Sequence, residues 1–315
     1  MVANGLALRW DEVQEADWSG LLARVERSSL EQSWAYGEGL AAAGHARVRR
    51  AIIEGEGQVL AVVQVLLKRH GPLLTQARIL RGPLFLDPAL DWSGKRAVLR
   101  AIGGQFSLRR RELLIWLPEL ADGLESQAAL RACGLRQVVT GYGLVACDLT
   151  EPIEELRGRL RGSWRRDLAA AERHGLAVRR ARDAQSLDWL IGRAETHRRR
   201  RGYAGPTSGE IRAVLAALPR RRKDLLLLIA GGAEPIAGVL FLIHGTTATY
   251  LLGWTGPEGR RLHAHNLLLW RAVEMLRERD LRWLDLGVVD ASAPGLARFK
   301  IGMGGELMTL AGTFM

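Results

Sequence analysis

The order of secondary-structure elements that the sequence predicts occurs twice, and this repeat constrains the fold more than any other feature. In the first half, apolar and alternating runs predict strands at 48–54, 59–67, 79–85 and 113–117, with a helix over 95–107. In the second half, strands are predicted at 225–230, 236–243, 248–254 and 283–287, with a helix over 267–279. Residues 60 and 236 of the second strands are 176 positions apart, and residues 113 and 283 of the last strands are 170 apart. Such nearly constant spacing indicates a duplicated unit.

Each half of the chain predicts a mixed α/β domain. Strands joined by short turns pair antiparallel, whereas a strand, a helix and a further strand form a parallel pair, so each sheet is mixed and covered by helices. A chain of 315 residues exceeds what one core usually organises. We place the boundary so that the domains are 1–149 and 150–315, because Thr150 can cap a helix and Pro152 can occupy its first turn. Alternatively, the final strand packs back on the first domain.

The segment after this boundary predicts one amphipathic helix. Apolar residues recur at helical spacing from Ile153 to Ala171, and Gly175 is expected to stop the element.

The sequence indicates a cytoplasmic protein, or one peripheral to the inner face of a membrane. No apolar run is long enough to span a bilayer, and no secretory signal is evident. Cys133 and Cys147 have no metal-ligand spacing and are expected to be core residues in a reducing compartment. His263 and His265 have His-x-His spacing but no third ligand nearby, so we predict no metal site.

Positive charge is concentrated in the second half. The net charge is +11, and the segment 157–223 alone holds 19 basic and 6 acidic residues. A basic surface of this kind attracts a polyanion such as RNA or an anionic membrane. The alternative is a compositional preference for arginine, spread over solvated faces.

Five short motifs then resemble, in their order and spacing, those of a known family. They are Gln-Ser-Trp-Ala-Tyr at 32–36, Trp-Arg-Arg-Asp at 164–167, Ala-His-Asn-Leu-Leu-Leu-Trp at 264–270, Trp-Leu-Asp-Leu-Gly at 283–287 and Gly-Leu-Ala-Arg-Phe-Lys at 295–300. Over most of its length the chain resembles the Fem family, tRNA-dependent aminoacyltransferases that build peptidoglycan interpeptide bridges and form a branch of the GNAT-like acyltransferases.

The resemblance implies two tandem GNAT-like domains with a cleft between them and no cofactor. The donor would be aminoacyl-tRNA, and the acceptor an amine of a cell-wall precursor or a related small molecule. Lys300 would stabilise the developing oxyanion or bind the tRNA end beside Phe299, and Arg165 or Arg166 would hold the nucleotide diphosphate of the precursor. One departure is that Gly37, Glu38 and Gly39 stand where such proteins often offer a lysine to these phosphates.

The remaining candidates follow from the chemistry of ester aminolysis. Asp285 or Asp290 could take a proton from the attacking ammonium, or each could bind turn amides. Asn266 could mark a helix start that binds an oxyanion, or act as a plain helix cap. Trp34 and Tyr36 could stack on a flat ligand, or belong to the core.

The basic run that consists of Arg198, Arg199, Arg200 and Arg201 is assigned to tRNA binding; no DNA partner is expected.

Two other function classes remain open. The first is a GNAT N-acetyltransferase that uses acyl-CoA, because the glycine-rich run 253–261 is similar, with imperfect spacing, to the loop that binds the coenzyme's pyrophosphate. A glycine-rich turn is the equal alternative for that run. The second class is a non-catalytic basic module that binds RNA or a membrane surface.

Overall fold

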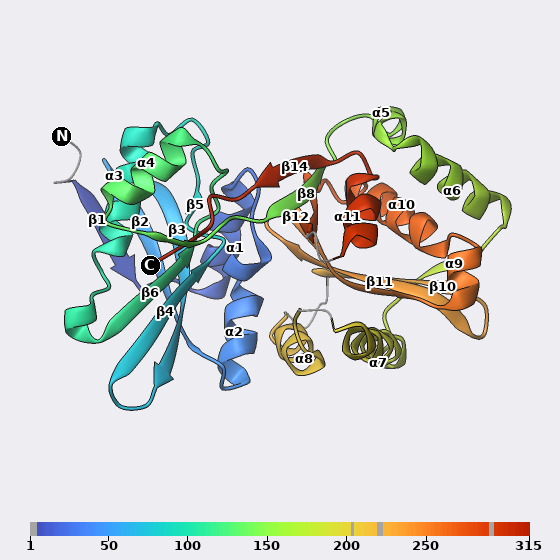
Figure 1. The fold of residues 1–315 in the computed structure, drawn as a ribbon, viewed down its shortest axis with the longest axis horizontal. Helices are drawn as coiled ribbons and strands as arrows, with labels where there is room; N and C mark the ends of the chain where they lie inside the picture. Colours follow the sequence, from blue (N-terminus) through green and yellow to red (C-terminus); the bar gives the residue numbers. More distant parts are fainter. Residues whose placement is uncertain (1–4, 203–204, 219–222, 290–292) are drawn as a thin grey trace.

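The computed structural model describes residues 5–202, 205–218, 223–289 and 293–315, which form two α/β domains side by side (Figure 1). Each domain contains a mixed sheet with helices on both faces, which confirms the predicted fold class. No helix among these residues is both long enough and apolar enough to cross a membrane.

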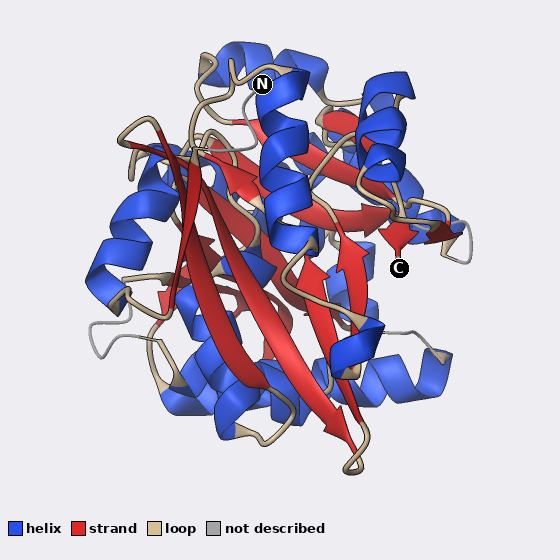
Figure 2. Cartoon of the chain, turned by 90° about the vertical axis from the view of Figure 1, so that its left-hand side faces the viewer, coloured by secondary structure: helices blue, strands red, loops and turns tan. Residues whose placement is uncertain are grey.

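The first sheet has the strand order β1-β2-β3-β4-β6-β15-β7, with β5 beside β3. Its strands are β1 (Leu6–Trp10), β2 (Arg47–Gly55), β3 (Gln58–His70), β4 (Leu74–Leu80), β5 (Leu84–Phe85), β6 (Glu112–Leu117), β7 (Gln137–Val139) and β15 (Thr313–Phe314). The helices α3 (Trp92–Gly103) and α4 (Leu124–Ala132) cover one face, and α1 (Glu15–Arg24) packs on the other. Figure 2 views this domain from its free side and shows its long, twisted strands.

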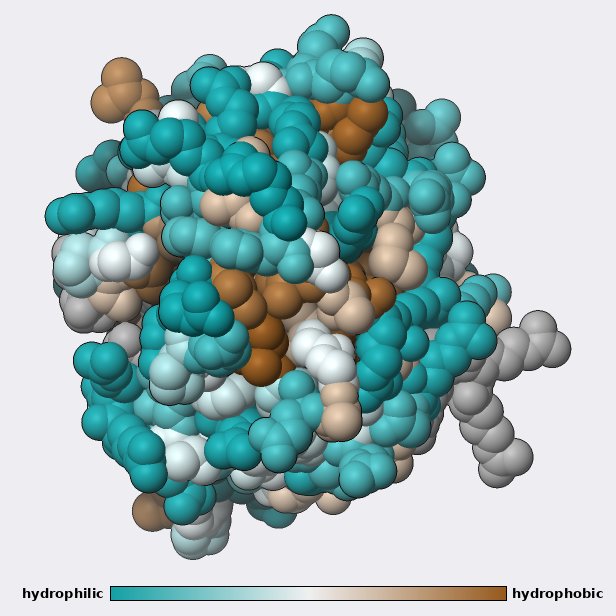
Figure 3. Space-filling model, turned by 90° about the vertical axis from the view of Figure 1, so that its right-hand side faces the viewer, coloured by the Kyte–Doolittle hydropathy of each residue, from teal (hydrophilic) through white to brown (hydrophobic). Residues whose placement is uncertain are grey.

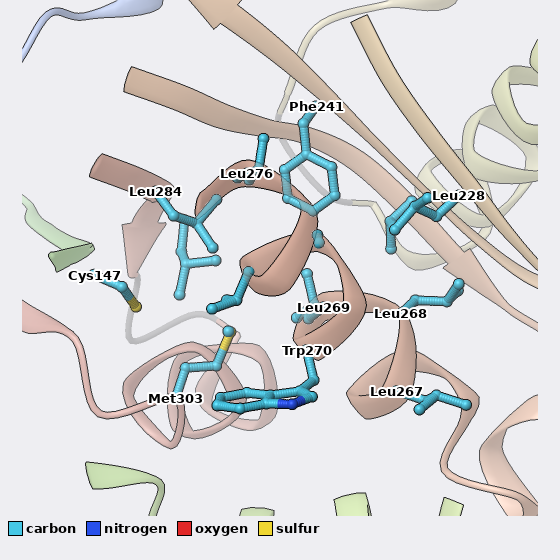
Figure 4. Close-up of a cluster of buried hydrophobic side chains, with 14 of the residues drawn as sticks. Cys147, Leu228, Phe241, Leu267, Leu268, Leu269, Trp270, Leu276, Leu284 and Met303 are labelled. Atoms are coloured by element: carbon cyan, nitrogen blue, oxygen red, sulfur yellow. The ribbon is translucent and has the colours of Figure 1, made fainter. Parts of the chain in front are cut away.

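The second sheet has the order β14-β8-β13-β12-β11-β10-β9. Its strands are β8 (Gly143–Asp148), β9 (Val178–Ala181), β10 (Leu225–Gly231), β11 (Pro235–His244), β12 (Thr247–Thr255), β13 (Trp283–Val289) and β14 (Glu306–Thr309). One face carries α5 (Ile153–Arg159), α6 (Gly162–Arg173) and α10 (Ala264–Arg277), whereas α7 (Ala184–Arg201) and α8 (Ser208–Ala216) cover the other. Figure 4 shows the main core, in which Leu268 and Leu269 of α10 lie between Leu228, Phe241 and Leu284 of the sheet.

The chain crosses twice between the domains. β8 already belongs to the second sheet, so the chain enters that sheet at Gly143, before the expected boundary at 149/150. Near the C-terminus, β14 pairs with β8 in the second sheet, and β15 then returns to pair with β6 in the first. The side chain of Phe314 is fully buried in the core of the first domain. The last residues therefore tie the two sheets together.

Two helices meet at the domain junction. α2 (Trp34–Ala42) from the first domain packs on α8 from the second. A Cβ atom at Gly39 would lie 2.5 Å from Cα of Val214, so only glycine permits this crossing. Gly37 is enclosed by Gln64 and Arg50 in the same way. Gly39 therefore serves the packing of α2 on α8, and Gly37 the packing of α2 on side chains of β2 and β3.

Three local predictions were wrong. The predicted strand 79–85 is divided into β4 and β5, because Arg81 adopts a left-handed conformation with φ of 50° and turns the chain. The predicted helix from Ile153 to Ala171 is broken into α5 and α6, because Leu160 and Arg161 have extended backbone between them. Thr150 does not cap α5: its hydroxyl donates to Asp148, and the N-cap position is Pro152.

Candidate functional site

A buried arginine joins the two domains where their sheets meet. We call this junction, around Arg81, Glu119 and Asp285, the seam. Arg81 donates two hydrogen bonds of 2.8 Å to the carboxylate of Glu119 in its own domain and one of 2.7 Å to Asp285 in the second domain. A third carboxylate, that of Glu31, lies 3.7 Å from the same Arg81 Nη1 atom. Burial opposes the charge of Arg81, but the three carboxylates together raise its pKa well above the usual value. Arg81 is therefore a permanent cation.

The strand geometry explains why these groups converge. Arg81 follows β4 and Glu119 follows β6, and these strands are parallel, so both residues lie at the same edge of the first sheet. In the second sheet, β12 pairs in parallel with β13 only from Thr247 to Thr249, where Asp285 is the last paired residue of β13. Beyond this point the two strands are no longer paired. Ligands in α/β proteins commonly bind where strands end or separate.

Lys300 lies beside the free end of β13. It belongs to α11 (Pro294–Ile301), is 8% exposed, and donates a hydrogen bond of 2.8 Å from Nζ to the carbonyl oxygen of Val288. A Cβ atom on Gly287 would stand 3.7 Å from Nζ, so the absence of a side chain leaves space next to the amine. Burial lowers the pKa of Lys300 to about 8, although Asp285 acts in the opposite direction. At neutral pH this lysine is still mainly a cation.

Both carboxylate oxygens of Asp285 already accept hydrogen bonds. Its Oδ2 accepts from Arg81, and its Oδ1 accepts from the backbone N–H of Gly287 at 2.7 Å. Burial alone would raise the pKa of Asp285, but the charge and hydrogen bond of Arg81 outweigh it and hold the pKa below its usual range. A carboxylate held in this way positions Arg81 and the β13 turn better than it accepts a proton. Asp290, the other predicted base, lies outside the described residues.

A second set of hydrogen bonds joins the two domains, through Ser28, His244 and Thr249. The Oγ atom of Ser28 lies 2.9 Å from Nδ1 of His244, and Nε2 of His244 lies 2.8 Å from Oγ1 of Thr249. Ser28 also donates to the carbonyl oxygen of His244, so its hydroxyl is left to accept from Nδ1. Burial lowers the pKa of His244 to about 3, so this imidazole is neutral.

Phe299, the residue before Lys300, packs on a histidine of α10. His265 contacts the ring of Phe299, and its two nitrogens lie 2.8 Å from Thr255 Oγ1 and 3.2 Å from Tyr250 Oη. Burial lowers the pKa of His265 to about 4. Among the residues described, no group of histidines, cysteines and carboxylates could hold a metal ion. His265 is held by these two hydroxyl groups and packs on Phe299, whose role in substrate binding remains a prediction.

Asn266 is not a helix cap. α10 begins at Ala264 after His263, which occupies the N-cap position with φ of 52°. Asn266 lies within the first turn, buried, and its Nδ2 atom has no hydrogen-bond partner among the described residues. Its predicted role in substrate binding remains a prediction.

The two predicted aromatic residues have different surroundings. The ring of Trp34 lies under the guanidinium of Arg50, whose Cζ is 3.6 Å from the ring centre. Tyr36 faces the second domain, where it packs against the core beneath α7 and α8. Burial raises the pKa of Tyr36, so its hydroxyl stays protonated.

The predicted arginines do not reach the seam. Arg165 and Arg166 are exposed on α6, which lies beside α10 on the outer part of the second domain (Figure 1). The run of four arginines ends α7, where Arg198 and Arg199 pair with Glu195. Arg200 and Arg201 are exposed. The face of the second domain away from the first is largely hydrophilic around an apolar hollow (Figure 3).

One open pocket lies apart from all the residues named so far in this site. It has a volume of about 790 Å³ and is lined by the end of α10 and the start of α5, including Thr150, Ile153 and Arg277. No predicted site residue lines it.

Sequence reasoning missed Arg81, Glu119, Glu31 and His244. Only Glu31 had a signal, because it directly precedes the Gln-Ser-Trp motif at 32–36.

The comparisons with known proteins agree with this geometry. Residues 156–300 match the family model described as an acetyltransferase (GNAT) domain. The crystal structure of FemX superposes with a TM-score of 0.81 at 16% identity, over 97% of this chain and 96% of FemX. The chain has the fold of FemX.

Two further structures share this fold. The C-terminal domain of a putative lysylphosphatidylglycerol synthetase from Agrobacterium fabrum matches with a TM-score of 0.55 at 14% identity, covering 96% of this chain and 92% of that one. A tandem GNAT protein from the clavulanic acid biosynthesis pathway matches with a TM-score of 0.51 at 13% identity, covering 98% of both chains. No curated protein matches the sequence. The tandem GNAT-like fold and the acyltransferase class of the second domain are confirmed.

Proposed function

We propose that this protein is an N-acyltransferase of the Fem type, which transfers an aminoacyl group from aminoacyl-tRNA to an amino group of a peptidoglycan precursor or a related small acceptor. The observation that carries the proposal is Lys300, a buried cation next to Gly287, which has no side chain to cover its amine, beside the charged seam of a FemX-like fold. Aminolysis of an activated ester needs two reactants held together and a positive group at the carbonyl oxygen. Lys300 supplies that group.

The glycine-rich run 253–261 supports tRNA over acyl-CoA as the donor. The backbone N–H of Gly256 is already donated to the carbonyl oxygen of Ile236, at 2.9 Å. A Cβ atom at Gly259 would lie 2.6 Å from that same oxygen. These two glycines let the turn pack on β11, so packing accounts for them without a pyrophosphate cradle. No bound coenzyme is required by the proposed reaction.

The basic surface supports a polyanionic donor. Arg200 and Arg201 are exposed at the end of α7, and Arg165 and Arg166 are exposed on α6. We propose that these two groups hold tRNA or the precursor's phosphates, and the same charge would favour an anionic membrane surface.

The test is to incubate the purified protein with a mixture of charged tRNAs and candidate amine acceptors, and to identify products by mass. A parallel reaction contains acetyl-CoA in place of tRNA. The proposal predicts an aminoacylated product whose formation weakens steeply as salt is raised, because tRNA binding releases counterions. Transfer from acetyl-CoA that does not depend on salt would favour the coenzyme-dependent alternative. Binding of RNA without any transfer would favour a non-catalytic module.

A further inference from the structure

Glu31 is the least well paired of the carboxylates around Arg81. Glu31, Glu119 and Asp285 surround this guanidinium, Arg27 Nη2 also lies 3.9 Å from Glu119, and Lys300 acts electrostatically on Asp285. Glu119 and Asp285 take the short hydrogen bonds, whereas Glu31 lies too far away for one. Its Oε2 atom is buried and has no hydrogen-bond partner among the described residues. A buried anion in this state is costly unless a further positive group completes it.

Glu31 is held rigidly and is still accessible. Glu31 is the second residue of a short 3-10 helix, η1 (Leu30–Gln32). Gln64 fixes the backbone of this helix, because its Nε2 donates to the carbonyl oxygen of Glu31 at 2.9 Å. Ser29, one residue earlier than this turn, donates to the carbonyl oxygen of Arg81 at 2.7 Å. The side chain of Glu31 is 26% exposed whereas its Oε2 atom is buried, so a ligand would have to enter past the exposed part of the side chain to reach that oxygen.

Two tyrosines and Asp285 lie around Glu31. Tyr36 and Tyr142 lie within electrostatic range of Glu31, and both stay protonated because burial raises their pKa values. Arg78, whose Nε atom is also buried without a partner among the described residues, lies at the margin near Tyr36. Asp285 is within electrostatic range of both Glu31 and Lys300. Asp285 therefore links the carboxylate of Glu31 to the end of β13 where Lys300 lies.

We infer that Glu31 binds the ammonium group of the acceptor and acts as the general base of the transfer. This inference rests on the proposed function and adds the residue that the sequence did not identify as the base. The ammonium gives the Oε2 atom of Glu31 the hydrogen-bonded cation that it lacks. Burial raises the pKa of Glu31, although Arg81 opposes this, so the carboxylate is a stronger base than an ordinary glutamate.

The proton and bond changes balance. Glu31 takes one proton from R–NH₃⁺ and becomes a neutral carboxylic acid. The free amine forms a C–N bond with the acyl carbon, and Lys300 stabilises the oxyanion. The bond from the acyl carbon to the ribose oxygen then breaks, and that oxygen takes the second proton of the nitrogen. Glu31 finally returns its proton to solvent.

The experiment compares two nucleophiles with the Glu31→Gln variant. A primary alkylamine acceptor is an ammonium ion at neutral pH and needs a base, whereas hydroxylamine is largely unprotonated and does not. We expect Glu31→Gln to lower kcat/KM with the alkylamine by about 100-fold, within the range of a general base, and to leave enzyme-dependent transfer to hydroxylamine within about twofold. Lys300→Ala should lower both reactions. Equal loss, or no loss, with both nucleophiles in folded Glu31→Gln would overturn the inference.

Controls separate this result from misfolding and from a failure of the proposed function. Glu26→Gln removes an exposed carboxylate close to the seam and should change neither reaction. If Glu31→Gln does not fold, Glu31→Asp retains the base and should keep part of the alkylamine reaction. A wild-type protein without any transfer refutes the proposed function, and calorimetric titration with n-butylammonium chloride then tests the site alone. Saturable binding that Glu31→Gln abolishes supports it, and absence of binding to wild type refutes it.

Discussion

The seam contains two buried cations that are stabilised differently. Arg81 is surrounded by carboxylates and stays charged at any accessible pH, whereas Lys300 has one carbonyl partner and a pKa lowered by burial to about 8. An arginine fixed by a bidentate carboxylate gives a rigid element of structure. A lysine with a single neutral partner keeps donors for a ligand. The second arrangement is the one that catalysis of ester aminolysis requires.

Replacing Lys300 by alanine tests this distinction. We expect Lys300→Ala to lower transfer at least about tenfold without unfolding the protein, because a cation at the carbonyl oxygen acts on the transition state. Single-turnover rates and circular dichroism would measure the two effects. Arg298→Ala, which removes an exposed cation from the same helix, is the matched control. Full activity in a folded Lys300→Ala protein would remove the role assigned to this residue.

The pH dependence of transfer gives a second measurement of Lys300. Its side chain is charged below a pKa of about 8 and neutral above it, so activity that needs the cation should fall as the pH rises through about 8. Lys300→Arg should move this fall to higher pH, because a guanidinium does not lose its proton there. A wild-type profile that stays flat from pH 7 to about 9.5 would contradict the assignment.

At the scale of single elements, the crossing of α2 and α8 depends on glycine. Gly39→Ala places a Cβ atom 2.5 Å from Cα of Val214, so the helices must separate. We expect a loss of about 1 to 3 kcal/mol in the free energy of unfolding, as for other overpacked sites, measured by urea denaturation. Gly20→Ala in α1 is the control, since no atom lies within 4 Å of the added Cβ. A Gly39→Ala protein as stable as wild type would contradict the prediction, because it would show that α2 and α8 can move apart at no cost in stability.

The elements themselves were largely predictable, but their junctions were not. The repeated strand and helix order follows from local periodicity, and β2, β3, β6, β10, β11, β12 and β13 all match predicted strands apart from small differences at their ends. The break at Arg81 does not follow from periodicity, because the left-handed φ of a non-glycine residue leaves no pattern. The Arg81–Asp285 contact joins residues 204 positions apart. Only the three-dimensional structure brings such partners together.

The residues of the candidate site were likewise predictable only in part. Lys300 and Phe299 could be named from a motif, and their roles in the reaction remain predictions. Glu31 had only its place before the motif at 32–36 to mark it, and Glu119 had no signal, because a carboxylate near a strand or turn is common and only the guanidinium that both share distinguishes them. For Asn266 the sequence left oxyanion binding and helix capping open; the structure excludes capping, because His263 occupies the N-cap position.

For the whole molecule, two buried histidines predict sensitivity to acid. In the unfolded chain both take up a proton near pH 6.5, whereas folded His244 does so only at about 3 and His265 at about 4. The unfolded state binds more protons in this interval, so stability should fall as the pH drops from 6.5 to about 4. Thermal melting across this range would measure the slope. His244→Gln should reduce it and His70→Gln, at an exposed position, should not. A slope unchanged in His244→Gln would contradict the prediction.

The return of β15 to the first sheet has a consequence for biosynthesis. During translation, residues 1–142 leave the ribosome long before Phe314, which fills the core of the first domain beside Trp116 of β6. Until then, the nascent first domain exposes an incomplete sheet edge. Maturation of the amino-terminal lobe must therefore wait until the entire second lobe has been synthesised, and the final residues complete both together.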